Sequence, residues 1–266
     1  DILDDLGIDY SHLKWDPDFD IDEVEDPRKF FVMSVDIAEG LRQDYSIINI
    51  FRLEEIPEVN LRELENATSI LDFFRLSQVG VFRSNQISIY NLAKMLYSMT
   101  VDIFDSENIR LVIEYNTYGQ QLIDGMKNLY PITNDFDEEI IVKFKHRINA
   151  KRKDQGLKLT GDNKKVACQD LKENIRTNRI MLSDKNTISE AGVFSRTPAG
   201  SYAAQTGNDD SIMTCVNAVQ ILSTRDWGEM VEEYFDYLEP ETQKNIDTMM
   251  NNIEGASNQF NIYDIL

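Results

Sequence analysis

Apolar residues follow two different spacings along this chain. In the first third they form runs rich in β-branched and aromatic side chains, at residues 30–36, 45–53 and 73–83. Runs of this length, bounded by turn residues such as Gly40, predict β-strands. From Ile87 to Met99 the apolar positions recur at helical spacing, which predicts an amphipathic helix over residues 88–104 with Ser88 as its cap.

The rest of the chain alternates short apolar runs with helical patterns. Residues 109–114 form an apolar run that ends on an acid, so they predict a fourth strand. Pro198 and Gly200 at the centre of residues 193–206 are typical of a hairpin. The other expected elements are helices at 119–129 and 162–178, a strand at 139–145, a short strand or helix exit at 180–182, and a helix that opens at 207–210.

This order of elements predicts the fold class. Three strands joined by short turns must pair antiparallel, whereas strands separated by helices normally join in parallel. The sequence therefore predicts an α/β protein with a mixed sheet, three antiparallel strands followed by parallel ones, and helices on both faces.

Charge divides the chain into three parts. The formal net charge is -20, but residues 1–30 hold eleven acids against three Lys or Arg, and residues 226–266 hold ten acids against one lysine. The middle is close to neutral, so the overall charge does not exclude a nucleic-acid partner. We expect an acidic linker at 1–29, a folded domain at 30–225, and an acidic C-terminal tail at 226–266 that is helical in places and loosely packed.

Other classes of protein are disfavoured. Two cysteines, Cys168 and Cys215, give no disulfide framework. No apolar run reaches the roughly 18 to 20 residues of a membrane-spanning helix, so no membrane contact is expected. The chain begins without methionine, and we expect it to be a fragment of a longer protein.

Acidic residues end two of the predicted strands and begin a predicted helix. Asp36 ends the first strand, Glu114 ends the fourth, and Asp209 and Asp210 open the helix. Carboxylates gathered at one sheet edge repel each other unless divalent cations neutralise them, and oxygen ligands select Mg²⁺ or Mn²⁺. Two such ions about 3.5 to 4 Å apart can hydrolyse phosphodiester bonds. The alternative for each acid is a helix cap or a strand-end salt bridge.

Three segments resemble a known family. They are Ser34–Gly40 followed by Gln43-Asp44-Tyr45, Val112–Gly119, and Gly207–Ser211. In this order they resemble the nuclease domain of tailed-bacteriophage terminase large subunits, over roughly residues 30–224. The resemblance implies a ribonuclease-H-like fold and a metal-dependent endonuclease that cuts double-stranded viral DNA concatemers during genome packaging.

The resemblance also implies roles for individual residues. Asp36 matches the acid that contacts both metal ions, and Glu114 matches the second acid. The third is Asp209 or Asp210, between which the sequence does not choose. Glu39 and Asp44 match acids that support the site, while Asn208 stands where the family usually has a histidine.

The same resemblance implies the binding partners of the chain. The expected partners are double-stranded DNA, an N-terminal ATPase domain of the full-length chain, the portal and the small terminase subunit, in the host cytoplasm. No phosphate-binding loop of the Gly-x-x-x-x-Gly-Lys type is present, so no ATPase activity is expected here. Sequence-independent contacts to DNA phosphates are expected from a group of basic residues, Lys151, Arg152, Lys153, Lys164 and Lys165.

Two other functions stay open on the sequence alone. One is a resolvase-like nuclease of the same fold, which needs a surface specific for DNA structure. The other is a catalytically idle docking module of a packaging motor, in which the acidic flanks recruit a partner.

Overall fold

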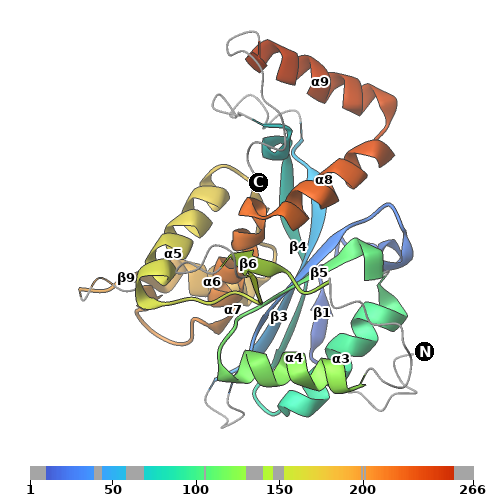
Figure 1. Ribbon diagram of the computed structural model, residues 1–266. Helices are drawn as coiled ribbons and strands as arrows, with labels where there is room; N and C mark the ends of the chain where they lie inside the picture. Colours follow the sequence, from blue (N-terminus) through green and yellow to red (C-terminus); the bar gives the residue numbers. More distant parts are fainter. Residues whose placement is uncertain are drawn as a thin grey trace.

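A mixed β-sheet runs through the centre of the molecule (Figure 1). The computed structural model describes residues 10–38, 44–57, 69–104, 106–129, 140–145, 153–198, 200 and 202–254. The strands of the main sheet are β1 (Leu13–Trp15), β2 (Phe31–Asp36), β3 (Ser46–Glu55), β4 (Phe74–Ser84), β5 (Ile109–Ile113) and β8 (Ile180–Met181). Two small hairpins pair β6 (Lys143–Lys145) with β7 (Lys153–Gln155) and β9 (Phe194–Arg196) with β10 (Tyr202–Ala204).

The sheet has the predicted directions. Its order is β1-β4-β3-β2-β5, with β8 beside β4. Strands β2, β3 and β4 pair antiparallel in succession, and β5 joins β2 in parallel. The predicted fold class, a mixed α/β sheet with helices on both faces, is confirmed, and so is the hairpin expected around Pro198.

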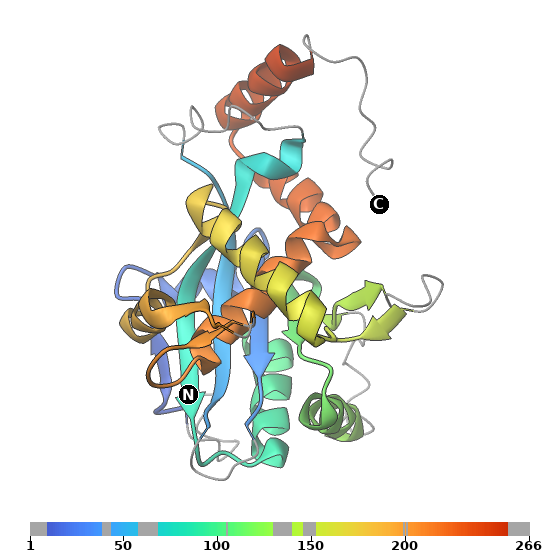
Figure 2. The ribbon, with the colours of Figure 1, turned by 90° about the vertical axis from the view of Figure 1, so that its left-hand side faces the viewer.

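Helices cover both faces of this sheet (Figures 1 and 2). The first face carries α3 (Ile89–Ser98) and α4 (Thr117–Leu129), which pack on Met33 and Val35. The opposite face carries α7 (Asp210–Ala218), with α5 (Gly161–Arg176) and α8 (Arg225–Tyr237) around it. Shorter or more peripheral helices are α6 (Lys185–Val193), α9 (Pro240–Glu254), η1 (Ile21–Glu25), η2 (Ile70–Phe73), η4 (Ser106–Asn108) and η7 (Val219–Ser223).

Strand β2 is the most deeply buried element of the sheet. Its residues from Phe31 to Val35 are all buried, because helices cover both of its faces and strands flank both of its edges. Only Asp36, at its end, is partly exposed. A strand in this position needs a nearly continuous apolar run, which is why its sequence does not alternate between apolar and polar residues.

The helix predicted over residues 88–104 ends earlier than expected. Helix α3 stops at Ser98 and passes into a π-helical turn, η3 (Met99–Ile103), in which the Phe104 N–H donates to the Met99 carbonyl over 2.9 Å. The Thr100 hydroxyl donates to the Tyr97 carbonyl over 3.0 Å, which competes with the regular helical hydrogen bonds.

The two flanks contribute to the folded domain. Residues 13–15, within the expected linker, form β1 along the edge of β4. For residues 225–237 the expectation of loose packing is wrong, because Trp227, Met230 and Tyr234 of α8 are buried in the core. The acidic side chains on the other side of this helix make the segment polar in overall composition, although its apolar residues share one face. None of the described helices combines the length and apolarity needed to span a membrane.

Burial of α8 generates a stability prediction. Trp227→Ala is expected to lower the free energy of unfolding by about 3–5 kcal/mol, because the ring is fully buried and leaves a cavity. Tyr237→Ala on the same helix, where the side chain is 54% exposed, is expected to cost about 0.5 kcal/mol or less. Urea unfolding of both variants measures the difference, and equal costs would contradict the packing of α8 on the core.

Candidate metal-binding active site

Asp36 stands at the end of β2, on the face that α7 covers. Side chains alternate across a strand, so Asp36 shares its face with Ser34 and not with Val35. Ser34 donates a hydrogen bond of 2.7 Å to the Thr214 carbonyl of α7, which identifies that face. The carboxylate of Asp36 therefore lies on the α7 side of the sheet, at the end where β2 stops.

Glu114 follows the neighbouring parallel strand at the same edge. Val35 of β2 pairs with Ile113 of β5, so Glu114 lies one residue further along β5, beside Asp36. The backbone around Glu114 is held by a short parallel bridge to Leu157. In that bridge Leu157 N–H donates to the Ile113 carbonyl over 2.7 Å, and Tyr115 N–H donates to the Leu157 carbonyl over 2.6 Å.

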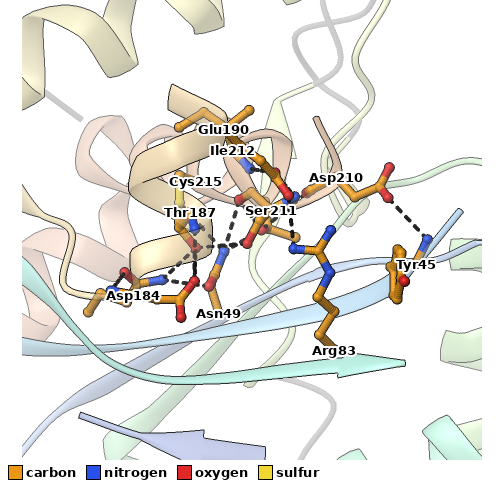
Figure 3. A network of polar contacts seen from close by, with 12 residues as sticks. Tyr45, Asn49, Arg83, Asp184, Thr187, Glu190, Asp210, Ser211, Ile212 and Cys215 are labelled. Atoms are coloured by element: carbon orange, nitrogen blue, oxygen red, sulfur yellow. Dashed lines mark hydrogen bonds and ion pairs between the residues drawn. The ribbon is translucent and has the colours of Figure 1, made fainter. Parts of the chain in front are cut away.

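Asp210 is the first residue of α7, and its charge acts on Asp36 at the same sheet edge. Its carboxylate accepts a hydrogen bond of 3.1 Å from the Tyr45 backbone N–H, just before β3 (Figure 3). Asp209 is the N-cap residue of α7 by position, but its side chain makes no capping hydrogen bond. The helix-cap alternative therefore does not describe either acid.

The negative charges of Glu114 and Asp210 act on Asp36. Burial raises the pKa of Asp36 to about 7, and the negative charges of Glu114 and Asp210 contribute in the same direction. Burial also raises the pKa of Glu114 and of Asp210. The structure thus places Glu114 and Asp210 within electrostatic reach of Asp36, and the surroundings of all three acids oppose their negative charge, which a bound cation would offset.

Lys164 of α5 lies within electrostatic reach of Asp36 and Glu114. Its ammonium group counteracts the rise in the pKa of both carboxylates. The sequence predicts Lys164 as one of a basic group, without indicating that its charge acts on these acids. Lys165, the next residue on α5, is half-buried.

The donor set fits a hard divalent ion in its chemistry. Asp36, Glu114 and Asp210 offer only carboxylate oxygens, which suit Mg²⁺ or Mn²⁺. Within the described residues, no three Asp, Glu, His or Cys side chains stand close enough together to ligate one ion. Ligation therefore requires these side chains to rotate toward one another, a movement that their mutual repulsion opposes and a bound cation favours.

Of the remaining predicted site residues, two acids act on the charge of Asp210, and most of the others lie outside the described residues. Asp44 is exposed, and it raises the pKa of Asp210, as Asp209 does. Asp209 also acts on the Cys168 thiol. Glu39, Lys151 and Arg152 lie outside the described residues, and of Lys153 only the backbone, at the start of β7, is described.

A buried polar network beneath α7 was not predicted. The Asn49 amide on β3 donates to the Ser211 carbonyl over 3.0 Å and to the Thr214 hydroxyl, and its oxygen accepts a bond of 2.7 Å from Gln78 on β4. These groups attach the first turns of α7 to the sheet, and Figure 3 shows Asn49 beneath the helix. The available signal was a polar residue inside each apolar run, Ser34 and Asn49, at positions that pair across β2 and β3.

Two glycines allow the chain to pass close to Glu114. A Cβ on Gly119 would lie 1.8 Å from the Glu114 carbonyl oxygen, and a Cβ on Gly156 would lie 2.7 Å from the Ile113 carbonyl oxygen. Gly156 also has a φ of 85°, which disfavours other residues. The backbone that carries Glu114 is therefore enclosed from two sides by residues without side chains.

Comparison with known proteins gives one kind of match. No protein-family model matches the chain. Solved structures of the large terminase nuclease from thermophilic phage G20c are similar to it: one with bound cobalt has a TM-score of 0.46 and 13% identity, and one with bound magnesium has 0.47 and 14%. A third has 0.45 and 13%. The matches cover 74% of this chain and 83%, 83% and 84% of those chains.

Close packing at Gly119 generates a second stability prediction. Gly119→Ala is expected to destabilise the protein by about 1–3 kcal/mol, because the methyl group overlaps the Glu114 carbonyl. Gly228→Ala in α8, where nothing lies within 4 Å of the new Cβ, is expected to stabilise it by about 0.5–1 kcal/mol through helix propensity. Thermal unfolding distinguishes the two. A stabilised Gly119→Ala variant would contradict the close approach.

Proposed function

We propose that this chain is a metal-dependent endonuclease domain that hydrolyses phosphodiester bonds of double-stranded DNA with two divalent ions. The observation that carries the proposal is that three acids come to one edge of the sheet, where the negative charges of Glu114 and Asp210 both act on Asp36. Such a cluster is costly unless it serves to bind cations.

Asp36 is the residue that we assign to both ions, because both Glu114 and Asp210 act on it. Bound ions would activate a water molecule for in-line attack and stabilise the leaving oxygen. Asp36, Glu114 and Asp210 hold the ions in place, and Mg²⁺ or Mn²⁺ is the expected pair. No side chain of the chain has to act as a nucleophile.

Asp210 is our assignment for the third ligand. It acts on the charge of Asp36, whereas Asp209 acts on Asp210 and on Cys168. Asp209 and Asp44 then form an outer set of negative charges that strengthens the attraction for cations. Glu39 remains a candidate for the same supporting role.

Basic residues near the acids provide the DNA contacts in this proposal. Lys164 acts on the charges of Asp36 and Glu114, which supports assigning its ammonium group to a phosphate near the cleavage position. Lys165 follows it on α5, and Lys151, Arg152 and Lys153 precede that helix in the sequence. Contacts to phosphates alone predict cleavage that is largely independent of base sequence.

The biological setting that we propose is the packaging of a viral genome. The three acidic motifs resemble those of terminase large subunits, in which the nuclease cuts concatemeric DNA. On this view the chain works in the host cytoplasm beside an ATPase domain, the portal and the small terminase subunit.

Plasmid cleavage tests the catalytic proposal. The chain is expected to nick and linearise supercoiled plasmid with Mn²⁺ or Mg²⁺, and Asp36→Asn or Glu114→Gln is expected to reduce the rate by about 100-fold or more, because loss of an ion removes several kcal/mol of transition-state stabilisation. Asp36→Asn should also unfold at the same or a higher temperature, since a repelled charge is removed.

Two results bear on the alternatives. Asp124→Asn, an exposed acid on α4, is the matched control and should cut at the wild-type rate. Absence of cleavage by the wild-type chain with every divalent metal would favour the docking module, and strict dependence on branched DNA would favour the resolvase-like nuclease.

The adjacent acids Asp209 and Asp210 can be separated by the same assay. Asp210→Asn is expected to lose as much activity as Asp36→Asn, whereas Asp209→Asn should lose about tenfold or less, because it only contributes a more distant charge. A larger loss in Asp209→Asn than in Asp210→Asn would reverse the assignment of the ligand.

A further inference from the structure

An ion pair between β4 and α6 lies near the N-terminus of α7, where Asp210 is the first residue. Arg83 of β4 donates to the Glu190 carboxylate of α6 over 2.9 Å, and the two side chains are only 23% and 10% exposed. Arg83 pairs across the sheet with Ile47, which in turn pairs with Asp36. The pair therefore belongs to the same end and the same face of the sheet as the acidic cluster.

Glu190 supplies the cap that α7 lacks at its own N-terminus. Its second carboxylate oxygen accepts the backbone N–H groups of Ser211 over 2.8 Å and of Ile212 over 3.1 Å (Figure 3). These are N–H groups of the first turn, which have no partner inside a helix. Glu190 thus satisfies the N–H groups at this helix start, while the Asp210 carboxylate accepts the Tyr45 N–H outside the helix.

Arg83 reaches Asp210 by a second route. Its guanidinium lies 4.4 Å from the centre of the Tyr45 ring, a cation–π contact on the residue whose backbone N–H donates to Asp210. The contact orients the segment that carries this donor. Arg83 also opposes the rise in the pKa of Asp210, so its charge reaches that carboxylate directly.

We infer that the Arg83–Glu190 ion pair is a positioning device for the Asp210 carboxylate, and that it sets the affinity of the site for divalent cations. The inference rests on the proposed function, because it takes Asp210 to be a metal ligand. Glu190 caps α7 and so holds the helix start that carries Asp210. Arg83 packs on the Tyr45 ring and so holds the residue whose N–H binds the Asp210 carboxylate. Neither residue is itself one of the three acids assigned as metal ligands.

A neighbouring cavity makes the ion pair accessible to a chemical test. A pocket of about 450 Å³ is lined by Tyr45, Arg83 and Glu190, together with His12 and Lys14. If Arg83 is truncated, a small planar cation can enter the vacated space from this pocket. Guanidinium is the cation that matches the missing group in shape and charge.

Direct metal titration tests the inference without relying on catalysis. Calorimetric titration of the chain with Mn²⁺ is expected to show affinity about 10–100-fold weaker in Arg83→Ala and Glu190→Gln than in wild type, as for other groups that orient metal ligands. Millimolar guanidinium should restore much of the Mn²⁺ affinity of Arg83→Ala and none of that of Glu190→Gln. Plasmid cleavage should recover with it, and excess Mn²⁺ should restore the rate in both variants.

Arg179→Ala is the matched control. Arg179 donates to Asp72 over 2.8 Å, and this pair is buried to a similar degree. The Arg179 carbonyl accepts from the Leu76 N–H near the start of β4, whereas Arg83 lies at the other end of that strand. Arg179→Ala should lower the unfolding temperature and leave Mn²⁺ affinity unchanged. If Arg83→Ala does not fold, Arg83→Lys, which retains the charge without the planar fork, replaces it and should weaken Mn²⁺ binding to a smaller extent.

The outcomes distinguish the positioning role of the ion pair from the proposed nuclease function. Variants that lose thermal stability but bind Mn²⁺ as wild type does would overturn the positioning role and leave the nuclease proposal intact. A wild-type chain that binds Mn²⁺ and cuts no DNA would overturn the nuclease proposal alone. A wild-type chain that binds no divalent ion would overturn both.

Discussion

Burial of acidic side chains at one sheet edge is the constraint on which the candidate site depends. Asp36, Glu114 and Asp210 come from two parallel strands and a helix, and each has its pKa raised where it stands. Burial and nearby like charge both disfavour ionised carboxylates, so these acids depend on the elements that hold them in this place. The elements that carry them are accordingly well fixed: β2 is buried on all sides, the Glu114 backbone is enclosed by two glycines, and α7 is attached to the sheet by buried hydrogen bonds.

The polar network under α7 has a different role from the apolar core. Apolar packing is tolerant of small shifts, whereas hydrogen bonds specify distance and direction. Ser34 of β2 and Asn49 of β3 bond to α7 directly, and Gln78 of β4 is connected to it through Asn49. Thr187 adds a contact from α6 through Ser211. A helix held in this way has a defined rotation about its axis. That rotation decides which residue of its first turn faces Asp36.

Local sequence patterns predicted the elements well. The apolar runs of β2, β3, β4 and β5 were recognisable because buried strands need such runs, and the order of strands and helices then left few possible pairings. The burial of α8 was missed, since its apolar stripe is interrupted by acids that face solvent. Lys164 was recognised as basic, but its approach to Asp36 and Glu114 depends on how α5 crosses the sheet.

The sequence by itself determined which residues carry the chemistry: acids that end apolar strands, and an acidic pair that opens a helix. Strand ends and helix starts are local features, so residue type and spacing are sufficient to find them. Tertiary structure alone decided that Asp210, held by Tyr45, acts on Asp36, and that Glu190 caps α7 while Arg83 binds Glu190. Those contacts join residues more than a hundred positions apart in several cases, and no local pattern records which of them meet when the chain folds.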